Sequence, residues 1–235
     1  MALISETDVI ILAGGRGTRL SSVVSDRPKV LADVRGRPLL AYLLDSLEKK
    51  GFHRVILSIG YMAEMIIQTI GHRHGSLQID YSVETEPLGT GGGLKLASIQ
   101  AKSENVLVLN GDSFCGFHAP DLFAFHSAQH ASGTIAVIDV ADAGRYGRVL
   151  LAPDGQILEF LEKTAGGAGS INAGIYLLKT TLLASLPAGI PLSIERDLFP
   201  SLIGQAFYGF PVSGPFLDIG LPETYAQAAD FFAVV

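Results

Sequence analysis

The chain of 235 residues contains only one cysteine, and this scarcity excludes several classes of protein. A single thiol cannot form an intrachain disulfide, nor can it supply a zinc or iron–sulfur site built from several cysteines. Only 17% of the residues are charged, which excludes a highly charged disordered chain. A chain of this length can bury roughly 70% of the surface that its unfolded state exposes, so it can fold without disulfides or a structural metal.

Basic residues are also scarce: 17 face 23 acidic ones, for a formal net charge of −6. This balance argues against nucleic acid and anionic membranes as partners, although a local cation cluster can still bind a phosphorylated small molecule. The uncharged stretch 198–217 is interrupted by three prolines and three glycines, so it predicts loops and not a membrane-spanning helix. The acidic residues Glu6 and Asp8, without a basic segment before them, predict no signal peptide and a cytoplasmic protein.

The order of apolar segments predicts an α/β fold. Short apolar runs at 9–13, 55–59, 79–83 and 106–109 alternate with helical patterns at 39–50, 62–70 and 94–99. Such alternation predicts a parallel sheet covered by helices. From Thr134 onward, predicted strands follow short turns, at 134–140, 149–151, 157–162 and 173–178. A hairpin is expected at Pro153-Asp154-Gly155 and a closing helix at about 222–232. The border between the two halves is a candidate cleft.

A glycine-rich loop, Leu12-Ala-Gly-Gly-Arg-Gly-Thr-Arg-Leu20, directly follows the first predicted strand. Its glycines allow backbone N–H groups to approach a phosphate, and Arg16 and Arg19 add positive charge. The loop does not match a Rossmann fingerprint, because Leu20 stands where a glycine is needed. It does not match a P-loop either, because that motif requires Lys and then Ser or Thr at positions 19 and 20. An ordinary turn from strand to helix is the alternative.

Together with Pro28-Lys29, this loop resembles the signature of the sugar-1-phosphate nucleotidyltransferases. Six further segments occur in that family's order and approximate spacing: Glu86-Pro-Leu-Gly-Thr-Gly-Gly-Gly93, Leu109-Asn-Gly-Asp112, Tyr146-Gly147, Glu162-Lys163, Asn172-Ala-Gly-Ile-Tyr176 and Asp218-Ile-Gly220. The resemblance covers essentially the whole chain. Within the family, it is most similar to the short guanylyltransferases that act on D-glycero-α-D-manno-heptose 1-phosphate, through Leu88–Gly92, Ser193-Ile-Glu195 and Asp218–Tyr225. Two positions depart from the family pattern, Thr164 and Val30, where relatives carry proline.

The resemblance implies a Rossmann-like nucleotidyltransferase fold: a mainly parallel, mixed central sheet flanked by helices, with a smaller sugar-binding β lobe. Residues 1–235 would form one nucleotidyltransferase domain, with a nucleotide-binding half at about 1–133 and a sugar-phosphate-binding half at about 134–235. In the implied reaction, a sugar 1-phosphate oxygen attacks the α-phosphorus of a nucleoside triphosphate and expels pyrophosphate. Because the attacking group is already an anion, the site needs cations, backbone donors and a divalent metal, and no general base.

The resemblance also implies roles for individual residues. Arg19, Lys29 and Asp112 would be catalytic, with Arg19 on the triphosphate and Lys29 on the α-phosphate or the departing pyrophosphate. Asp112 and Asp218 would hold Mg²⁺, for which Mn²⁺ would substitute. The nucleotide would contact Leu12, Ala13, Gly14, Gly15, Gly17, Thr18, Glu86, Gly89, Thr90 and Gly111. The sugar phosphate would contact Tyr146, Gly147, Glu162, Lys163, Asn172 and Gly174.

Guanine is the expected base, because its N1–H and N2–H₂ donors can pair with one carboxylate. Glu86 is the candidate carboxylate, with Gly89 and Gly91 allowing the backbone to approach the base; reading by backbone groups is the alternative. The expected function is transfer of a guanylyl group from GTP to heptose 1-phosphate for surface polysaccharide synthesis. The alternatives are a mannose 1-phosphate guanylyltransferase, a UDP-sugar pyrophosphorylase and a non-catalytic sugar-nucleotide sensor. A homodimer stays open.

Two other features favour structural roles. His126 and His130 are spaced i, i+4 on a predicted helix and could bind zinc, but without a third ligand we expect a pair on the helix surface. Cys115 lies close to Asp112 in the sequence, and we expect it to be a small buried residue and not a nucleophile.

Overall fold

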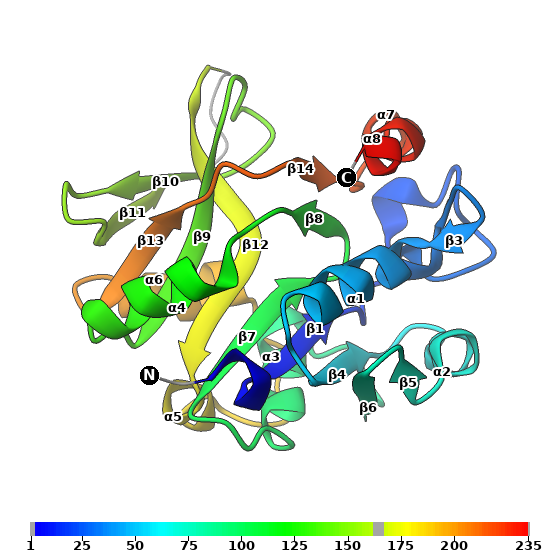
Figure 1. The fold of residues 1–235 in the computed structure, drawn as a ribbon, viewed down its shortest axis with the longest axis horizontal. Coiled ribbons are helices and arrows are strands. Elements are labelled where there is room, and N and C mark those ends of the chain that lie inside the picture. Colours follow the sequence, from blue (N-terminus) through cyan, green and yellow to red (C-terminus); the bar gives the residue numbers. More distant parts are fainter. Residues whose placement is uncertain (1–2, 162–166, 235) are drawn as a thin grey trace.

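The computed structural model describes residues 3–161 and 167–234. Its centre is a ten-stranded sheet, in which the order of the main strands is β11-β10-β12-β7-β1-β4-β6-β5 (Figure 1). The first half of the chain supplies four parallel strands and a short antiparallel edge strand: β1 (Asp8–Leu12), β4 (Arg54–Ile59), β6 (Leu77–Val83), β7 (Asn105–Asn110) and β5 (Arg73–His74).

The second half extends the same sheet with mostly antiparallel pairs. The long strand β12 (Gly169–Lys179) joins the halves, because it pairs with β7 in the register Ile175–Leu109. Beyond it lie β9 (Gly133–Val140), β13 (Phe207–Pro211) and the hairpin of β10 (Arg148–Leu151) and β11 (Ile157–Leu161). The expected mixed α/β fold and its hairpin are therefore confirmed.

Helices cover both faces of the sheet. Side chains of β1 alternate between two cores, since Val9 and Ile11 belong to one and Ile10 to the other; burial on both faces explains why the strand is apolar throughout. On the first face pack α1 (Leu39–Lys49), α2 (Ala63–Ile70) and α4 (Ala119–Ala128). On the second pack α3 (Gly89–Ser98), α5 (Thr180–Ala184) and α6 (Phe199–Leu202).

Short elements surround the carboxyl ends of the parallel strands. They are the 3₁₀ turns at Thr18–Leu20 and Lys29–Leu31, the hairpin of β2 (Asp33–Val34) and β3 (Arg37–Pro38), the pair β8 (Ser113–Cys115) and β14 (Phe216–Asp218), and the π-helical turn Ile194–Leu198; a further 3₁₀ turn, Ile4–Glu6, precedes β1. The closing helix is two helices, α7 (Pro222–Ala226) and α8 (Ala228–Val234). No helix in the described residues is long and apolar enough to cross a membrane.

Two details correct the sequence-based expectations, and a third agrees with them. The predicted helix at 94–99 begins earlier, at Gly89, so the glycine run is the first part of α3 and not a separate turn. The predicted surface pair of histidines is wrong: His126 is buried, with its ring nitrogens 2.8 Å from Thr134 Oγ1 and 3.3 Å from Asn105 Oδ1, whereas His130 follows the end of α4. Cys115 is buried, as expected, and burial raises its pKa to about 12.

Candidate active site

A cavity of about 740 Å³ opens at the carboxyl ends of the parallel strands. Ligands bind at this edge of open α/β sheets, because the loops that follow the strands meet there. Most of the predicted site residues line the cavity: Leu12, Ala13, Gly14, Gly15, Gly17, Thr18, Arg19, Lys29, Glu86, Gly89, Thr90, Asp112, Tyr146, Asn172, Gly174 and Asp218. The fold thus brings the nucleotide and sugar-phosphate candidates of the two halves into one cavity.

Among the described candidates, Gly111 and Gly147 are not part of the cavity lining. The backbone N–H of Gly111 donates to Leu12 O at 2.9 Å, and a side chain on Gly111 would meet the same oxygen, so this glycine packs against β1. Gly147 precedes β10, where a side chain would contact Leu161 O. The expected sugar-phosphate residues Glu162 and Lys163 lie outside the described residues.

The glycine loop takes the conformation that its composition allows. Gly17 has φ of 60° and starts the 3₁₀ turn that carries Arg19, and Leu20 at the end of that turn is buried. A side chain at Gly15 would meet no atom within 4 Å, so this stretch of backbone is open to the cavity. The loop therefore offers backbone and Arg19, which is exposed, to a ligand.

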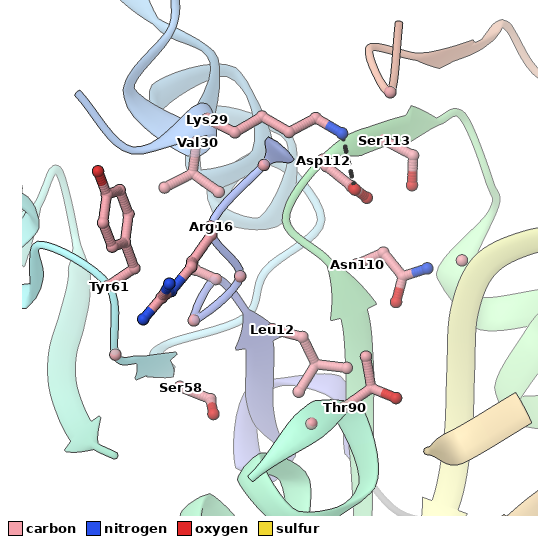
Figure 2. A pocket seen from close by; sticks show the side chains of 18 of the residues that line it. Leu12, Arg16, Lys29, Val30, Ser58, Tyr61, Thr90, Asn110, Asp112 and Ser113 are labelled. Atoms are coloured by element: carbon pink, nitrogen blue, oxygen red, sulfur yellow. Dashed lines mark hydrogen bonds and ion pairs between the residues drawn. The ribbon is translucent and has the colours of Figure 1, made fainter. Parts of the chain in front are cut away.

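The cation expected at the reacting phosphate is held in place by a carboxylate. Lys29 Nζ lies 2.9 Å from Asp112 Oδ2, and the pair is visible at the top of the cavity in Figure 2. The lysine side chain is only 10% exposed, whereas Asp112 is 41% exposed. The carboxylate thus remains accessible on its outer side while it orients the ammonium group.

Of the two predicted metal ligands, Asp112 directly precedes β8 and Asp218 ends the neighbouring strand β14. β8 and β14 are antiparallel, with Asp218 opposite Ser113, and the Ile219 N–H donates to Asp112 O at 3.1 Å. Asp218 Oδ1 accepts from Gly220 N at 2.6 Å. Two carboxylates form an oxygen donor set that suits Mg²⁺, which keeps several waters and takes few protein ligands. In the described part of the chain no three His, Cys, Asp or Glu side chains could jointly hold a metal, so water or substrate would complete the shell.

Three glycines at the start of α3 allow residues 190–192 to pack closely against this helix. Side chains at Gly89, Gly91 and Gly92 would come within 2.5–2.9 Å of residues 190–192. The Leu192 carbonyl accepts from the N–H groups of Gly91 at 2.8 Å and Gly92 at 3.4 Å. The expectation that Gly91 lets the backbone approach the base is therefore wrong, because Leu192 already occupies that side of the helix.

Comparisons with known proteins agree with this geometry. The model of a family described as nucleotidyl transferase matches residues 8–233. The chain belongs to the nucleotidyl transferase family. It is 38% identical over 222 residues to the D-glycero-α-D-manno-heptose 1-phosphate guanylyltransferase of Aneurinibacillus thermoaerophilus, which covers 94% of this chain and 96% of that protein. It is 31% identical to the mannose-1-phosphate guanylyltransferase of Mycobacterium tuberculosis, over 95% of this chain but only 64% of the relative.

Solved structures agree as well. The crystal structure of HddC from Yersinia pseudotuberculosis superimposes with a TM-score of 0.87 at 36% identity, covering 96% of this chain and 99% of the other. A second structure of HddC, complexed with GMP-PN, gives a TM-score of 0.86 over the same shares of both chains. The family resemblance inferred from the motifs is confirmed.

In this nucleotidyl transferase a second carboxylate, Glu84, lies deeper in the cavity than the predicted Glu86. Its Oε2 accepts from Leu88 N at 2.9 Å, and its Oε1 lies where side chains on Gly14 and Gly93 would clash. Burial raises the pKa of Glu84, whereas Glu86 is exposed at the cavity wall. The sequence contained a signal for Glu84, since it opens the same acidic segment two residues before Glu86.

Glu195 and Asn110 also line the cavity, and neither was among the predicted contacts. Glu195 Oε2 accepts from Ser193 Oγ at 3.0 Å and from Thr90 Oγ1 at 3.3 Å, while Thr90 Oγ1 accepts from Ile194 N. These bonds hold the π-helical turn of the second half against the start of α3. The Ser193-Ile-Glu195 segment was noted only for its resemblance; its place in the site depends on this long-range packing.

Proposed function

We propose that the protein transfers a guanylyl group from GTP to D-glycero-α-D-manno-heptose 1-phosphate, giving GDP-heptose and pyrophosphate for surface polysaccharide synthesis. The observation that carries this proposal is the extent of the similarity. The heptose 1-phosphate guanylyltransferase is matched over 96% of its length, whereas the mannose-1-phosphate enzyme extends well beyond the match, which spans 64% of it. HddC complexed with GMP-PN supports a guanine nucleotide as the donor.

The cavity supports the chemistry of this transfer. Two polyanions must meet in it, and Arg16, Arg19 and Lys29 line the cavity near the glycine loop. Preorganised cations and backbone donors stabilise the charge that develops on the α-phosphoryl group and on pyrophosphate. Asp112 and Asp218 would hold Mg²⁺, with Mn²⁺ as a substitute. When bound, the ion would supply further positive charge for the phosphoryl oxygens.

With one buried cysteine and an acidic balance, we propose a cytoplasmic enzyme that binds neither nucleic acid nor membrane. We also propose that the protein forms a homodimer. Analytical ultracentrifugation of the purified chain, which measures its oligomeric state, tests this.

A pyrophosphate-release screen tests the function. The purified protein is incubated with Mg²⁺, with each of ATP, CTP, GTP and UTP, and with mannose, glucose or heptose 1-phosphate. We expect GTP with heptose 1-phosphate to give the highest kcat/KM. Preference for mannose 1-phosphate would favour the mannose enzyme, and preference for UTP a UDP-sugar pyrophosphorylase. Nucleotide binding without turnover of any pair would favour the sugar-nucleotide sensor.

A further inference from the structure

A buried tyrosine connects the two sides of the cavity. Tyr176 is fully buried on β12, and its hydroxyl lies 3.0 Å from Asn172 Nδ2 and 3.4 Å from Asn110 Oδ1. Both asparagines line the cavity, Asn110 at the end of β7 in the first half and Asn172 on β12 in the second. The strand register is irregular between Asn172 and Tyr176, where Gly174 has φ of 76°.

The direction of each hydrogen bond in this chain follows from its first member. The backbone N–H of Gly174 can only donate, so the Asn172 oxygen that it reaches at 2.8 Å is Oδ1. Asn172 Nδ2 therefore faces Tyr176 and donates to the phenol oxygen. The phenol then has one proton to give, and Asn110 Oδ1 accepts it. Burial raises the pKa of Tyr176, which keeps that proton in place.

These hydrogen bonds determine the orientation of the Asn110 side-chain amide. With Oδ1 turned toward Tyr176, its Nδ2 must point the other way, and it lies 3.0 Å from where a side chain on Gly174 would project. Figure 2 shows Asn110 at the end of its strand, below Ser113 and the Lys29–Asp112 pair. Asn110 is also the register partner of Leu12, where the glycine loop begins. Its amide donors thus lie between the loop and the Asn172–Gly174 wall.

We propose that Tyr176 is a positioning residue: its buried hydroxyl fixes the Asn110 amide with Nδ2 facing the cavity, where it donates to a phosphate oxygen of a substrate. The proposal rests on the proposed function only in requiring that the cavity bind phosphorylated substrates. Glycine at 174 is part of the arrangement, because a Cβ there would lie 3.0 Å from Asn110 Nδ2 and 2.8 Å from Ser113 Oγ. The phosphate belongs either to the nucleotide or to the sugar 1-phosphate.

A double-mutant cycle tests this role. We expect Asn110→Ala to lower kcat/KM by about tenfold or more, the loss of a hydrogen bond to a charged group, and Tyr176→Phe to lower it by roughly threefold or more. In the Asn110→Ala background, Tyr176→Phe should change kcat/KM by less than about twofold, because the two residues act as one unit. A rise in KM for GTP alone identifies the nucleotide phosphate as the acceptor, and a rise for the sugar 1-phosphate alone identifies the sugar phosphate.

Two results would overturn the proposal. The first is an unchanged kcat/KM in Asn110→Ala. The second is that Tyr176→Phe lowers kcat/KM by the same factor in the wild-type protein and in Asn110→Ala, which would show that the tyrosine is purely structural. Tyr81→Phe is the matched control, because its hydroxyl donates to the Gly71 carbonyl away from the cavity. It should lower Tm without changing kcat/KM. If the screen identifies another substrate pair, the cycle is run with that pair. If nothing is turned over, Kd for GTP replaces kcat/KM, so this proposal is tested separately from the function.

Discussion

Lys29 and Asp112 lie 83 residues apart in the sequence, yet their side chains form an ion pair of 2.9 Å. The lysine side chain is nearly buried, and the aspartate is open to the cavity on its other side. One residue thus serves two expected purposes, since Asp112 orients a cation and is also a predicted metal ligand. The pairing brings opposite charges together at the point where two polyanionic substrates would meet.

Removing either expected cation should slow the reaction far more than it destabilises the fold. Lys29→Met and Arg19→Ala should each lower kcat by about 10²-fold or more, because each removes a preorganised positive charge. Tm should change little, since Arg19 is exposed and Asp112 keeps contact with solvent. Arg73→Ala on the edge strand β5 is the control and should keep full activity. Full activity in either of the first two variants would remove that residue from the mechanism.

Activity should depend on a divalent metal held by two carboxylates. Chelation should abolish turnover, and Mg²⁺ or Mn²⁺ should restore it, whereas Zn²⁺, which prefers nitrogen and sulfur ligands, should not. Asp112→Asn and Asp218→Asn should each raise the Mg²⁺ concentration needed for half-maximal rate by about tenfold or more. Asp121→Asn, on the exposed start of α4, should leave it unchanged. A response of only one of the two aspartates would show that one carboxylate holds the ion alone.

Base selection should depend more on Glu84 than on Glu86. A half-buried carboxylate that loses its donor partner pays a desolvation cost of ~1–3 kcal/mol, whereas an exposed one is compensated by water. Glu84→Gln should therefore reduce the GTP-to-UTP ratio of kcat/KM by about tenfold or more, and Glu86→Gln should reduce it much less. Steady-state kinetics with both nucleotides measures the ratios. The reverse order would assign the base to Glu86, and an equal loss with both nucleotides would make Glu84 structural.

The buried His126 should make the fold sensitive to acid. Burial lowers its pKa to about 4 from an ordinary value of 6.5. Between these pH values the unfolded chain binds the proton and the folded chain does not, so stability falls as pH falls from 6.5 to 4. Over this pH range the free energy of unfolding should decrease by an amount on the order of 3 kcal/mol. His126→Gln, measured by urea unfolding, should flatten this slope, and the exposed His130→Asn should not. An unchanged slope in His126→Gln would assign the acid sensitivity to other groups.

Alanine substitutions at two glycines should have different effects, one on the stability of the fold and the other on nucleotide binding. A side chain at Gly92 would lie 2.7 Å from Ile190 O, so Gly92→Ala should destabilise the fold by about 1–3 kcal/mol through overpacking. Gly15→Ala has free space, so it should change stability by less than about 0.5 kcal/mol but raise KM for GTP, because the methyl group enters the cavity lining. Thermal unfolding and kinetics on both variants check this. A stable Gly92→Ala would show that residues 190–192 can move away from α3.

Local sequence patterns were enough to predict the parallel half of the sheet and the glycine loop that we propose binds phosphate groups. The β-branched run before Gly14 and the leucine spacing of α1 act over a few residues, where backbone preference and apolar periodicity decide the outcome. The roles expected for Lys29 and Asp112 came instead from the resemblance of their motifs to those of the family. The tertiary structure decided the rest. The segment of Asp218 lies beside that of Asp112 only because β14 pairs with β8, and Glu84 is half-buried only because Gly14 and Gly93 leave it space. His126 faces the sheet, and Leu192 crowds α3, through contacts between distant segments that no local pattern encodes.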